Sequence, residues 1–380
     1  MHDFPFFIGL LDEHNLHDSY GLPSKLPISL SYDSNKKLIV QDYSKKIDHY
    51  LEKSYLIGSN ISANLGSGNF GKRRANDVLK YLKLALKEEI SNKSFLEVGC
   101  ADGYILNQLS LMGAKKVLGC EPNQSNANKI KNNNVNIISD FYTPEIVNEK
   151  FDVILSLGVL EHIHEPDKFV KSQLKSLKQD GLIFFSVPNC EKKLMLGDLK
   201  IIQHEHWNYF TRTSITQLLS SCGLKNIKTV LSLNSANIFV WANFNKEYSS
   251  NDESPSGSDK KLFKNFCKKI QKSKKLMIER AKSNLRNGKT LGFIAGGLEL
   301  MSILSFIKSP RFFDNDFSKH RKFLPGYLNS IEDPQTLKGD PVDDLWICAT
   351  DYNDEIIDSL KDIIDEKVNL FSIKDALLNL

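Results

Sequence analysis

The fold is decided by the stretch Phe95-Leu96-Glu97-Val98-Gly99-Cys100-Ala101-Asp102-Gly103, which precedes a helix expected to begin near Tyr104. An apolar run typical of a buried β-strand ends in an acidic residue, and two glycines follow. Glycine suits positions 99 and 103 because a tight turn needs backbone conformations that other residues resist, and because a ligand must approach the main chain closely. A lone glycine motif also occurs in turns that bind nothing, so the neighbouring segments must decide.

Strand-like apolar runs alternate with helical stretches through the centre of the chain. These runs span residues 95–98, 116–120, 135–138, 151–156 and 182–187. Such alternation predicts a parallel sheet with helices on both faces. Two further runs, 227–231 and 238–244, lie close together with Asn234 and Ser235 between them, which predicts a closing antiparallel hairpin. The predicted fold class is α/β, with a Rossmann-like sheet of seven strands.

Three consecutive strands are expected to end in side chains that suit adenosine. Glu121 follows the second run about twenty residues beyond the glycine turn, where a carboxylate can accept both hydroxyls of a ribose. Asp140 and Phe141 follow the third run and offer a hydrogen-bond acceptor and an aromatic face to an adenine. Each residue alone fits an ordinary solvated strand end. Together with Glu97 they predict one ligand-binding edge of the sheet.

These motifs resemble the class I S-adenosylmethionine-dependent methyltransferases, which have E-x-G-x-G or E-x-G-x-x-x-G where nicotinamide-binding dehydrogenases have G-x-G-x-x-G. The resemblance covers residues 94–244 and includes the segment 157–163 after the fourth strand. It implies S-adenosylmethionine as the cofactor. The residues that it implies for cofactor binding are Glu97, Gly99, Cys100, Gly103, Glu121, Pro122, Asp140, Phe141 and Leu157.

The segment 203–210, Gln-His-Glu-His-Trp-Asn-Tyr-Phe, follows the fifth strand and is expected to cover the mouth of the site. Histidine, with a pKa near ~6.5, is the natural proton acceptor at neutral pH. We predict His206 as the general base, Glu205 as the residue that orients it or the acceptor, and His162 as a second candidate. Two histidines spaced as H-x-H can chelate zinc, but a third ligand is not evident nearby, so no metal is expected. His164 is expected to be a solvated loop residue.

The H-E-H-x-x-Y-F pattern is similar to a segment of the three-domain sugar-nucleotide methyltransferases, whose acceptor pocket, by resemblance, would contain Glu205, His206 and His162. The chain departs from that family in having no cysteine before Cys100, so the usual four zinc-binding cysteines are missing. The predicted acceptor-binding residues are Tyr55, Gln203, Tyr209, Gly296 and Gly297. The Gly-Gly turn either cradles a phosphate with free N–H groups or is a bare strand-to-helix turn.

We predict an irregular N-terminal lobe over 1–75, a methyltransferase domain over 76–245, a linker and helix over 246–288, and a Rossmann-like α/β lobe over 289–380. The linker is rich in Ser, Asn and Asp and cannot pack a core. A strand is expected near each of 290–295, 311–313 and 344–349 in the last lobe.

The composition sets limits on the partners. Fifty basic and 46 acidic side chains leave a net charge of only +4, which demands neither a nucleic acid nor a membrane surface. The start of the chain does not resemble a signal peptide, and the apolar run 291–307 is shorter than a membrane span and carries Glu299. Six scattered cysteines do not suggest a disulfide framework. We therefore expect a cytoplasmic protein with a small-molecule substrate.

The resulting interpretation is methyl transfer from S-adenosylmethionine to a nucleotide-linked sugar of surface polysaccharide or deoxysugar biosynthesis. The methylated atom is left open among carbon, oxygen and nitrogen. Methylation of a lipid or polyketide precursor is one alternative, and a non-catalytic binding subunit with the same fold is another. A nicotinamide-dependent oxidoreductase built on 292–297 fits poorly, because no ribose-binding acid follows at a strand end.

Overall fold

The protein folds into two compact units, which we call the large-sheet unit and the small-sheet unit. The computed structural model describes residues 2–6, 10–11, 13, 22–56, 68–128, 130, 134–233, 235–244 and 259–380, without the side chains of 2, 3, 5, 55, 56 and 68–70. The large-sheet unit comprises Leu30–Glu191 and Glu205–Lys260. The small-sheet unit comprises Met1–Ser29, Lys192–His204 and Lys261–Leu380.

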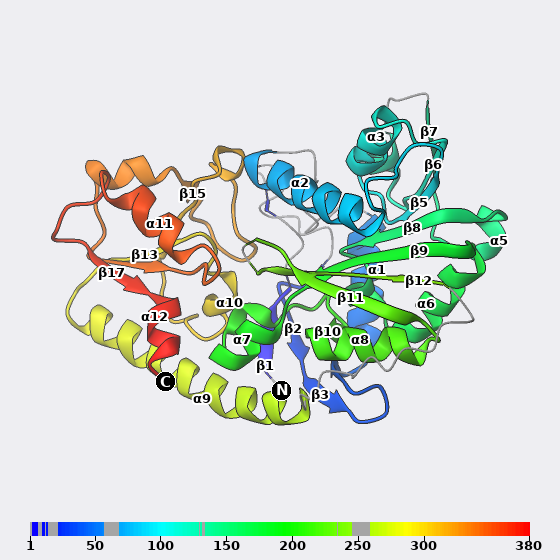
Figure 1. Ribbon diagram of the computed structural model, residues 1–380. Helices are drawn as coiled ribbons and strands as arrows, with labels where there is room; N and C mark the ends of the chain where they lie inside the picture. The colour runs from blue at the N-terminus through cyan, green and yellow to red at the C-terminus, as the bar shows by residue number, and fades with distance from the viewer. Residues whose placement is uncertain are drawn as a thin grey trace. The chain divides into compact units, whose positions relative to one another are not determined.

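The large-sheet unit is built on a seven-stranded sheet in the order β11-β12-β9-β8-β5-β6-β7 (Figure 1). Its strands are β5 (Ser94–Val98), β6 (Lys116–Cys120), β7 (Val135–Ile138), β8 (Phe151–Leu157), β9 (Leu177–Pro188), β11 (Lys225–Leu231) and β12 (Asn237–Asn243). All neighbours from β7 to β9 are parallel, and β12 is antiparallel to both β9 and β11. The predicted seven-stranded α/β sheet and its closing hairpin are confirmed.

Successive residues of the central strands pack into two separate cores, because side chains alternate between the faces of a sheet. Phe95, Phe184 and Leu155 face a cluster formed with α2 (Gly68–Ala85) and α3 (Tyr104–Leu111). Their neighbours, such as Leu96 and Phe185, face a second cluster. Burial on both faces explains why these strands read as continuous apolar runs.

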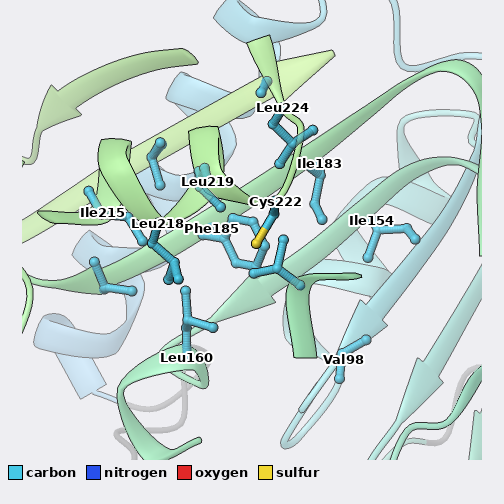
Figure 2. Packing of buried hydrophobic residues seen from close by; sticks show 14 of the residues in the cluster. Val98, Ile154, Leu160, Ile183, Phe185, Ile215, Leu218, Leu219, Cys222 and Leu224 are labelled. Atoms are coloured by element: carbon cyan, nitrogen blue, oxygen red, sulfur yellow. The ribbon is translucent and has the colours of Figure 1, made fainter. Parts of the chain in front are cut away.

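The second cluster lies under the helices α6 (Pro166–Lys175) and α8 (Arg212–Ser221). Figure 2 shows Ile215 and Leu218 of α8 beside Phe185 of β9, with Leu160 close by. Leu160 begins the short helix η2 (Leu160–His162), which follows β8. This packing therefore anchors the segment that carries His162.

The remaining elements of the large-sheet unit are short, apart from one helix. They are β3 (Leu30–Asp33), β4 (Leu38–Gln41), α1 (Lys45–Leu56), α4 (Gln124–Ala127), α5 (Pro144–Val147) and β10 (Asn208–Tyr209). β10 pairs with β4, which pairs with β3, in a second sheet. Through β10 this sheet holds the segment that follows His206.

The small-sheet unit contains a five-stranded sheet in the order β15-β14-β13-β16-β17, parallel throughout, which confirms the predicted C-terminal α/β lobe. Its strands are β13 (Leu291–Ile294), β14 (Arg311–Phe313), β15 (Ile331–Glu332), β16 (Asp344–Ile347) and β17 (Asn369–Ser372). Its helices are α9 (Asp259–Arg286), whose first two residues are assigned to the large-sheet unit, and α10 (Leu298–Met301), η4 (Phe317–Lys319), η5 (Pro334–Lys338), α11 (Asn353–Leu360) and α12 (Ile373–Leu378).

The two units differ from the predicted boundaries at 75, 245 and 288. Residues 1–75 do not form one lobe: the pair β1 (His2–Pro5) and β2 (Lys25–Ile28) belongs to the small-sheet unit, and β3 onwards to the other. The segment with α7 (Glu191–Leu196) and η3 (Leu199–Ile201) also enters the small-sheet unit from residue 192. Long-range packing of this kind leaves no local sequence signal. The predicted linker falls mostly on 245–258, outside the described residues.

Among the helices that the structure describes, we find none that combines the length and the apolar character needed to cross a membrane.

Candidate active site

The glycine turn after β5 adopts left-handed backbone at Gly99, Ala101 and Gly103, with φ of 75°, 46° and 67°. A side chain is excluded at two of these positions. A Cβ at Gly99 would lie 2.6 Å from Val159 Cγ2, and one at Gly103 would lie 2.6 Å from Ile130 Cδ1. The Gly99 N–H donates to Cys120 O at 2.8 Å. The turn is thus tied to the end of β6 and packed directly against the residue that precedes η2.

Glu121 holds this turn through its carboxylate. It is almost fully buried at the end of β6, and its two oxygens accept the N–H groups of Ala101 and Asn123, each at 2.9 Å. A carboxylate oxygen has two lone pairs, so both can accept a further donor. The structure therefore places Glu121 beside the glycine turn, where the sequence predicts it. Its proposed ribose contact stays a prediction.

Glu97 brings a second carboxylate to the same place. Its side chain is 2% exposed at the end of β5, and within the described residues its Oε2 has no hydrogen-bond partner. Desolvation by burial, and then the charges of Asp102 and Glu121, raise the pKa of Glu97 well above its usual value. A buried, unpaired carboxylate is costly and is stabilised by a cationic ligand group. The end of β5 is therefore suited to a positively charged ligand.

The other predicted cofactor residues lie at the same edge of the sheet but differ in exposure. Asp140 and Phe141 follow β7 and are exposed, Phe141 with 57% of its surface, and their contact with an adenine stays a prediction. Leu157 and Pro122 are half-buried, and Cys100 is buried between the turn and the sheet. Parallel strands bring these ends together at the point where the connections switch faces, which is where open α/β sheets bind ligands.

His162, Glu205 and His206 meet at this edge, together with Glu161. The His162 Nδ1–H donates to Glu205 O at 2.9 Å, and the ring centroids of His162 and His206 are 5.0 Å apart. Glu161 Oε1 lies 3.9 Å from His162 Nε2. The sequence analysis places three of these residues in one pocket, and the structure brings all three together. We call the four the His-Glu cluster.

Both carboxyl groups of the cluster are drawn towards the neutral form. Desolvation raises the pKa of Glu205 to about 7; His162 lowers it and Glu161 raises it. Desolvation also raises the pKa of Glu161, against the charges of His162 and Arg74. A group with a pKa near neutrality, as Glu205 has, can both accept and donate protons at working pH. The cluster is therefore equipped for proton transfer.

Asn208 fixes the turn that carries Glu161 and His162. Its buried Nδ2 donates to Leu160 O at 3.2 Å and to Ile163 O at 2.6 Å, on either side of the two residues. The Trp207 N–H also donates to Glu161 O at 2.8 Å. Together with the bond from His162 to Glu205 O, these hydrogen bonds join the segment after β9 to the segment after β8 at four points.

The predicted acceptor residues are placed less uniformly. Tyr209 is fully buried in β10, with its ring centroid 6.3 Å from that of His206. Gln203 is half-buried and belongs to the small-sheet unit, so it is not in the unit that holds the cluster. The side chain of Tyr55 lies outside the described residues. His204 is also in the small-sheet unit, where its Nε2–H donates to Leu26 O at 2.9 Å.

Gly296 and Gly297 form a turn between β13 and α10, with φ of 119° and 121°. The Lys200 Nζ donates to Ala295 O at 3.2 Å and would lie 2.8 Å from a Cβ at Gly296. α10 has only four residues. The structure therefore gives the turn a neighbouring cation but no long helix behind it, and phosphate binding stays a prediction.

Glu161 is the residue that the sequence analysis missed. It stands beside His162, yet an acidic residue next to a histidine is common on protein surfaces, and nothing local shows that its side chain is 3% exposed. Glu161, His162 and His206 each offer one possible ligand atom, and these atoms lie within 4.8 Å of one another. His204, the other histidine of the H-x-H pattern, is not part of this group.

Comparisons with known proteins assign the central part of the chain. Residues 70–229 match the model of a family described as "Methyltransferase domain". A ubiquinone biosynthesis O-methyltransferase of Pelagibacter ubique is 28% identical over 120 residues, which are 30% of this chain and 50% of the relative. One of Bartonella tribocorum is 32% identical over 105 residues, 26% of this chain and 42% of the relative. The chain therefore spans half or less of the length of these relatives.

A crystal structure of an S-adenosylmethionine-dependent methyltransferase from Mesorhizobium loti overlaps 43% of this chain and 96% of that protein. The sequence identity is 12% and the TM-score is 0.35. The assignment of the fold rests on the family match and on the strand order of the seven-stranded sheet, not on this low-scoring overlap.

Proposed function

We propose that this chain, whose residues 70–229 form a methyltransferase domain, uses S-adenosylmethionine to methylate a small acceptor held at the His-Glu cluster. The observation that carries the proposal is the position of the cluster. Val159, next to η2, packs against Gly99 of the predicted cofactor turn, so the turn and the cluster are neighbours.

The residues at the end of β5 fit this cofactor. S-adenosylmethionine carries an ammonium group and a sulfonium centre, and Glu97 offers a buried carboxylate oxygen without a partner. Gly99 and Gly103 allow the left-handed turn and the direct packing of Val159 and Ile130 against it. Glu121 would bind the ribose, and Asp140 with Phe141 the adenine. When bound, the cofactor supplies an activated methyl group.

The cluster would supply the proton chemistry. The acceptor atom would form a bond to the methyl carbon as the bond from that carbon to sulfur breaks, which leaves S-adenosylhomocysteine. The acceptor would also lose a proton, and His206 would take it. Glu205 would orient the imidazole or the acceptor, and His162, held by the Glu205 carbonyl, would line the same pocket. Positioning of this kind can supply several kcal/mol of a transfer barrier, and a base contributes ~10² to 10⁴-fold.

We propose a nucleotide-linked sugar as the acceptor. The support is the resemblance of the segment 203–210 to sugar-nucleotide methyltransferases and the presence of a second α/β unit with a Gly296-Gly297 turn. O-methylation of an aromatic hydroxyl is the second candidate, because the relatives matched over the central domain are named ubiquinone biosynthesis O-methyltransferases.

A panel of nucleoside-diphosphate sugars and of catechol-type phenols, each incubated with the protein and S-adenosylmethionine, separates these candidates. Mass spectrometry should detect the gain of one CH₂ unit on a sugar nucleotide. A gain on the phenols alone would move the assignment to the second candidate. No gain on any acceptor, together with no calorimetric binding of S-adenosylhomocysteine, would contradict methyl transfer itself.

The base assignment predicts the effect of His206→Ala. Turnover should fall at least 100-fold, because the acceptor loses its proton acceptor, while the affinity for S-adenosylhomocysteine should stay within about twofold. His164→Ala is the matched control, since His164 is an exposed histidine near the cluster. Unchanged turnover in the His206 variant would remove this residue from the mechanism.

A further inference from the structure

We infer that Glu161, His162 and His206 form a binding site for one divalent transition-metal ion. The inference goes beyond the proposed function, since methyl transfer assisted by a histidine base needs no metal. Its chemical role rests on that function, whereas the binding of the ion does not.

The donor atoms are close to the separation that a metal ion needs. One ligand atom of each residue lies within 4.8 Å of the others, and Glu161 Oε1 is 3.9 Å from His162 Nε2. A tetrahedral site with bonds of ~2.1 Å keeps its donors ~3.4 Å apart. Small side-chain rotations therefore close the site without movement of the backbone.

The carboxylate of Glu161 has an oxygen atom that could bind a cation. Its side chain is 3% exposed, and its Oε2 has no hydrogen-bond partner among the described residues. Burying a carboxylate oxygen without a partner is costly. A cation beside His162 and His206 would offset that cost.

The surroundings already orient the ligands as metal sites require. The His162 Nδ1–H donates to Glu205 O, so the lone pair is on Nε2, the nitrogen that faces Glu161. A hydrogen bond from the second ring nitrogen to a carbonyl is the usual support of a metal-bound histidine. Asn208 and the Trp207 N–H hold the backbone around Glu161 and His162.

The donor set selects the kind of ion. Two imidazoles and one carboxylate suit zinc and neighbouring transition metals with at least one open position, whereas Mg²⁺ and Ca²⁺ prefer oxygen ligands throughout. An open position could hold the acceptor oxygen and lower its pKa. With the ion bound, His206 would act as a ligand in place of its role as the base, and the proton of the acceptor would pass to water.

The test measures binding of Co²⁺, a spectroscopic probe for such sites. The purified full chain is treated with a chelator, dialysed and titrated with Co²⁺, and the visible absorption and the bound metal per chain are recorded. The wild type should bind one equivalent. Glu161→Gln and His206→Gln, which keep the size of the side chains, should each weaken binding at least tenfold. His164→Gln, on an exposed histidine near the cluster, should bind as the wild type does.

The possible outcomes distinguish a failure of the metal-site inference from a failure of the proposed methyl transfer. Wild-type affinity in both Glu161→Gln and His206→Gln, with melting temperatures near that of the wild type, would overturn the inference, as would a wild type without a bound equivalent. Methyl transfer by chelated protein that binds no Co²⁺ would leave the proposed function standing alone. Co²⁺ binding by a protein that ignores S-adenosylhomocysteine would support the site and count against the function.

Discussion

At Gly99, a single added Cβ atom would disturb the predicted cofactor-binding turn. A Cβ at this position would meet Val159 Cγ2 at 2.6 Å, and the residue also adopts φ of 75°. We expect Gly99→Ala to destabilise the fold by about 1 to 3 kcal/mol through backbone strain and the clash. It should also weaken S-adenosylhomocysteine binding at least tenfold, measured by calorimetry, because the turn must move.

Gly113→Ala is the control for this variant. Gly113 has a similar φ of 85°, but an added Cβ would meet only Ser91 Cβ at 3.8 Å. It should therefore lower the melting temperature through strain while leaving ligand affinity unchanged. Equal affinities for the ligand in the two variants would contradict the close fit assigned to Gly99.

Asp152 is a residue whose charge state should be visible in the acid stability of the protein. Burial alone would raise the pKa of its carboxyl, but hydrogen bonds from Lys178 and Ser94 outweigh burial and lower the pKa from 3.8 to about 2. Because the folded-state pKa is the lower one, the stabilisation is present above pH 3.8 and is lost as the pH falls towards 2.

Asp152→Asn should therefore lower the free energy of unfolding by about 1 kcal/mol at neutral pH. The effect is this small because Asp152 and Lys178 are partly exposed to solvent. The difference from the wild type should shrink as the pH falls from about 4 towards 2, in urea unfolding followed by circular dichroism. Glu165→Gln, which removes an exposed ion pair with Lys168, should change little at either pH. A pH-independent cost of Asp152→Asn would contradict the assigned ionisation.

At the scale of elements, η2 depends on a side chain from another segment. Asn208→Ala removes both hydrogen bonds to the carbonyls of Leu160 and Ile163 and should cost about 1 to 3 kcal/mol, because buried acceptors lose their donor. Turnover should fall further than in Asn329→Ala, which removes one amide-to-carbonyl bond in the small-sheet unit. If the Asn208 and Asn329 variants lost the same amount of stability and had the same turnover, the role of Asn208 would be structural only.

The strands of the two sheets could largely be predicted from the sequence, whereas the contacts between distant segments could not. The strands β6, β7 and β14 have the predicted bounds, because short apolar runs bordered by polar residues carry a local signal. By contrast, β9 begins at Leu177 and not at 182 as predicted, because the polar residues at 178–180 give no strand signal in the sequence. The burial of Glu161 depends on Trp207 and Asn208, which are more than forty residues away, and no local pattern encodes it.

At the scale of the whole molecule, two compact units imply that unfolding need not be a single transition. Asp344 holds the small-sheet unit: it is fully buried and accepts hydrogen bonds from Arg280, Asn284, Trp346 and Asn369. Asp344→Asn keeps the size but removes the charge opposite Arg280, which should cost about 3 to 5 kcal/mol.

Differential scanning calorimetry with and without S-adenosylhomocysteine should then distinguish the unfolding transitions of the two units. The ligand should raise the transition of the large-sheet unit, and Asp344→Asn should lower the other one. Asp362→Asn, on an exposed carboxylate of the small-sheet unit, should leave both transitions in place. One transition that responds to both the ligand and the Asp344 substitution would show that the units unfold together.

The interleaved composition of the two units also bears on how the protein is made. The small-sheet unit takes residues from before 30, from 192–204 and from beyond 260. On the ribosome, its early strands β1 and β2 must therefore wait until residues 261–380 have been synthesised, while the large-sheet unit can already close. During that interval the apolar side of these strands is exposed, and this nascent stage is where we expect the chain to depend most on chaperones.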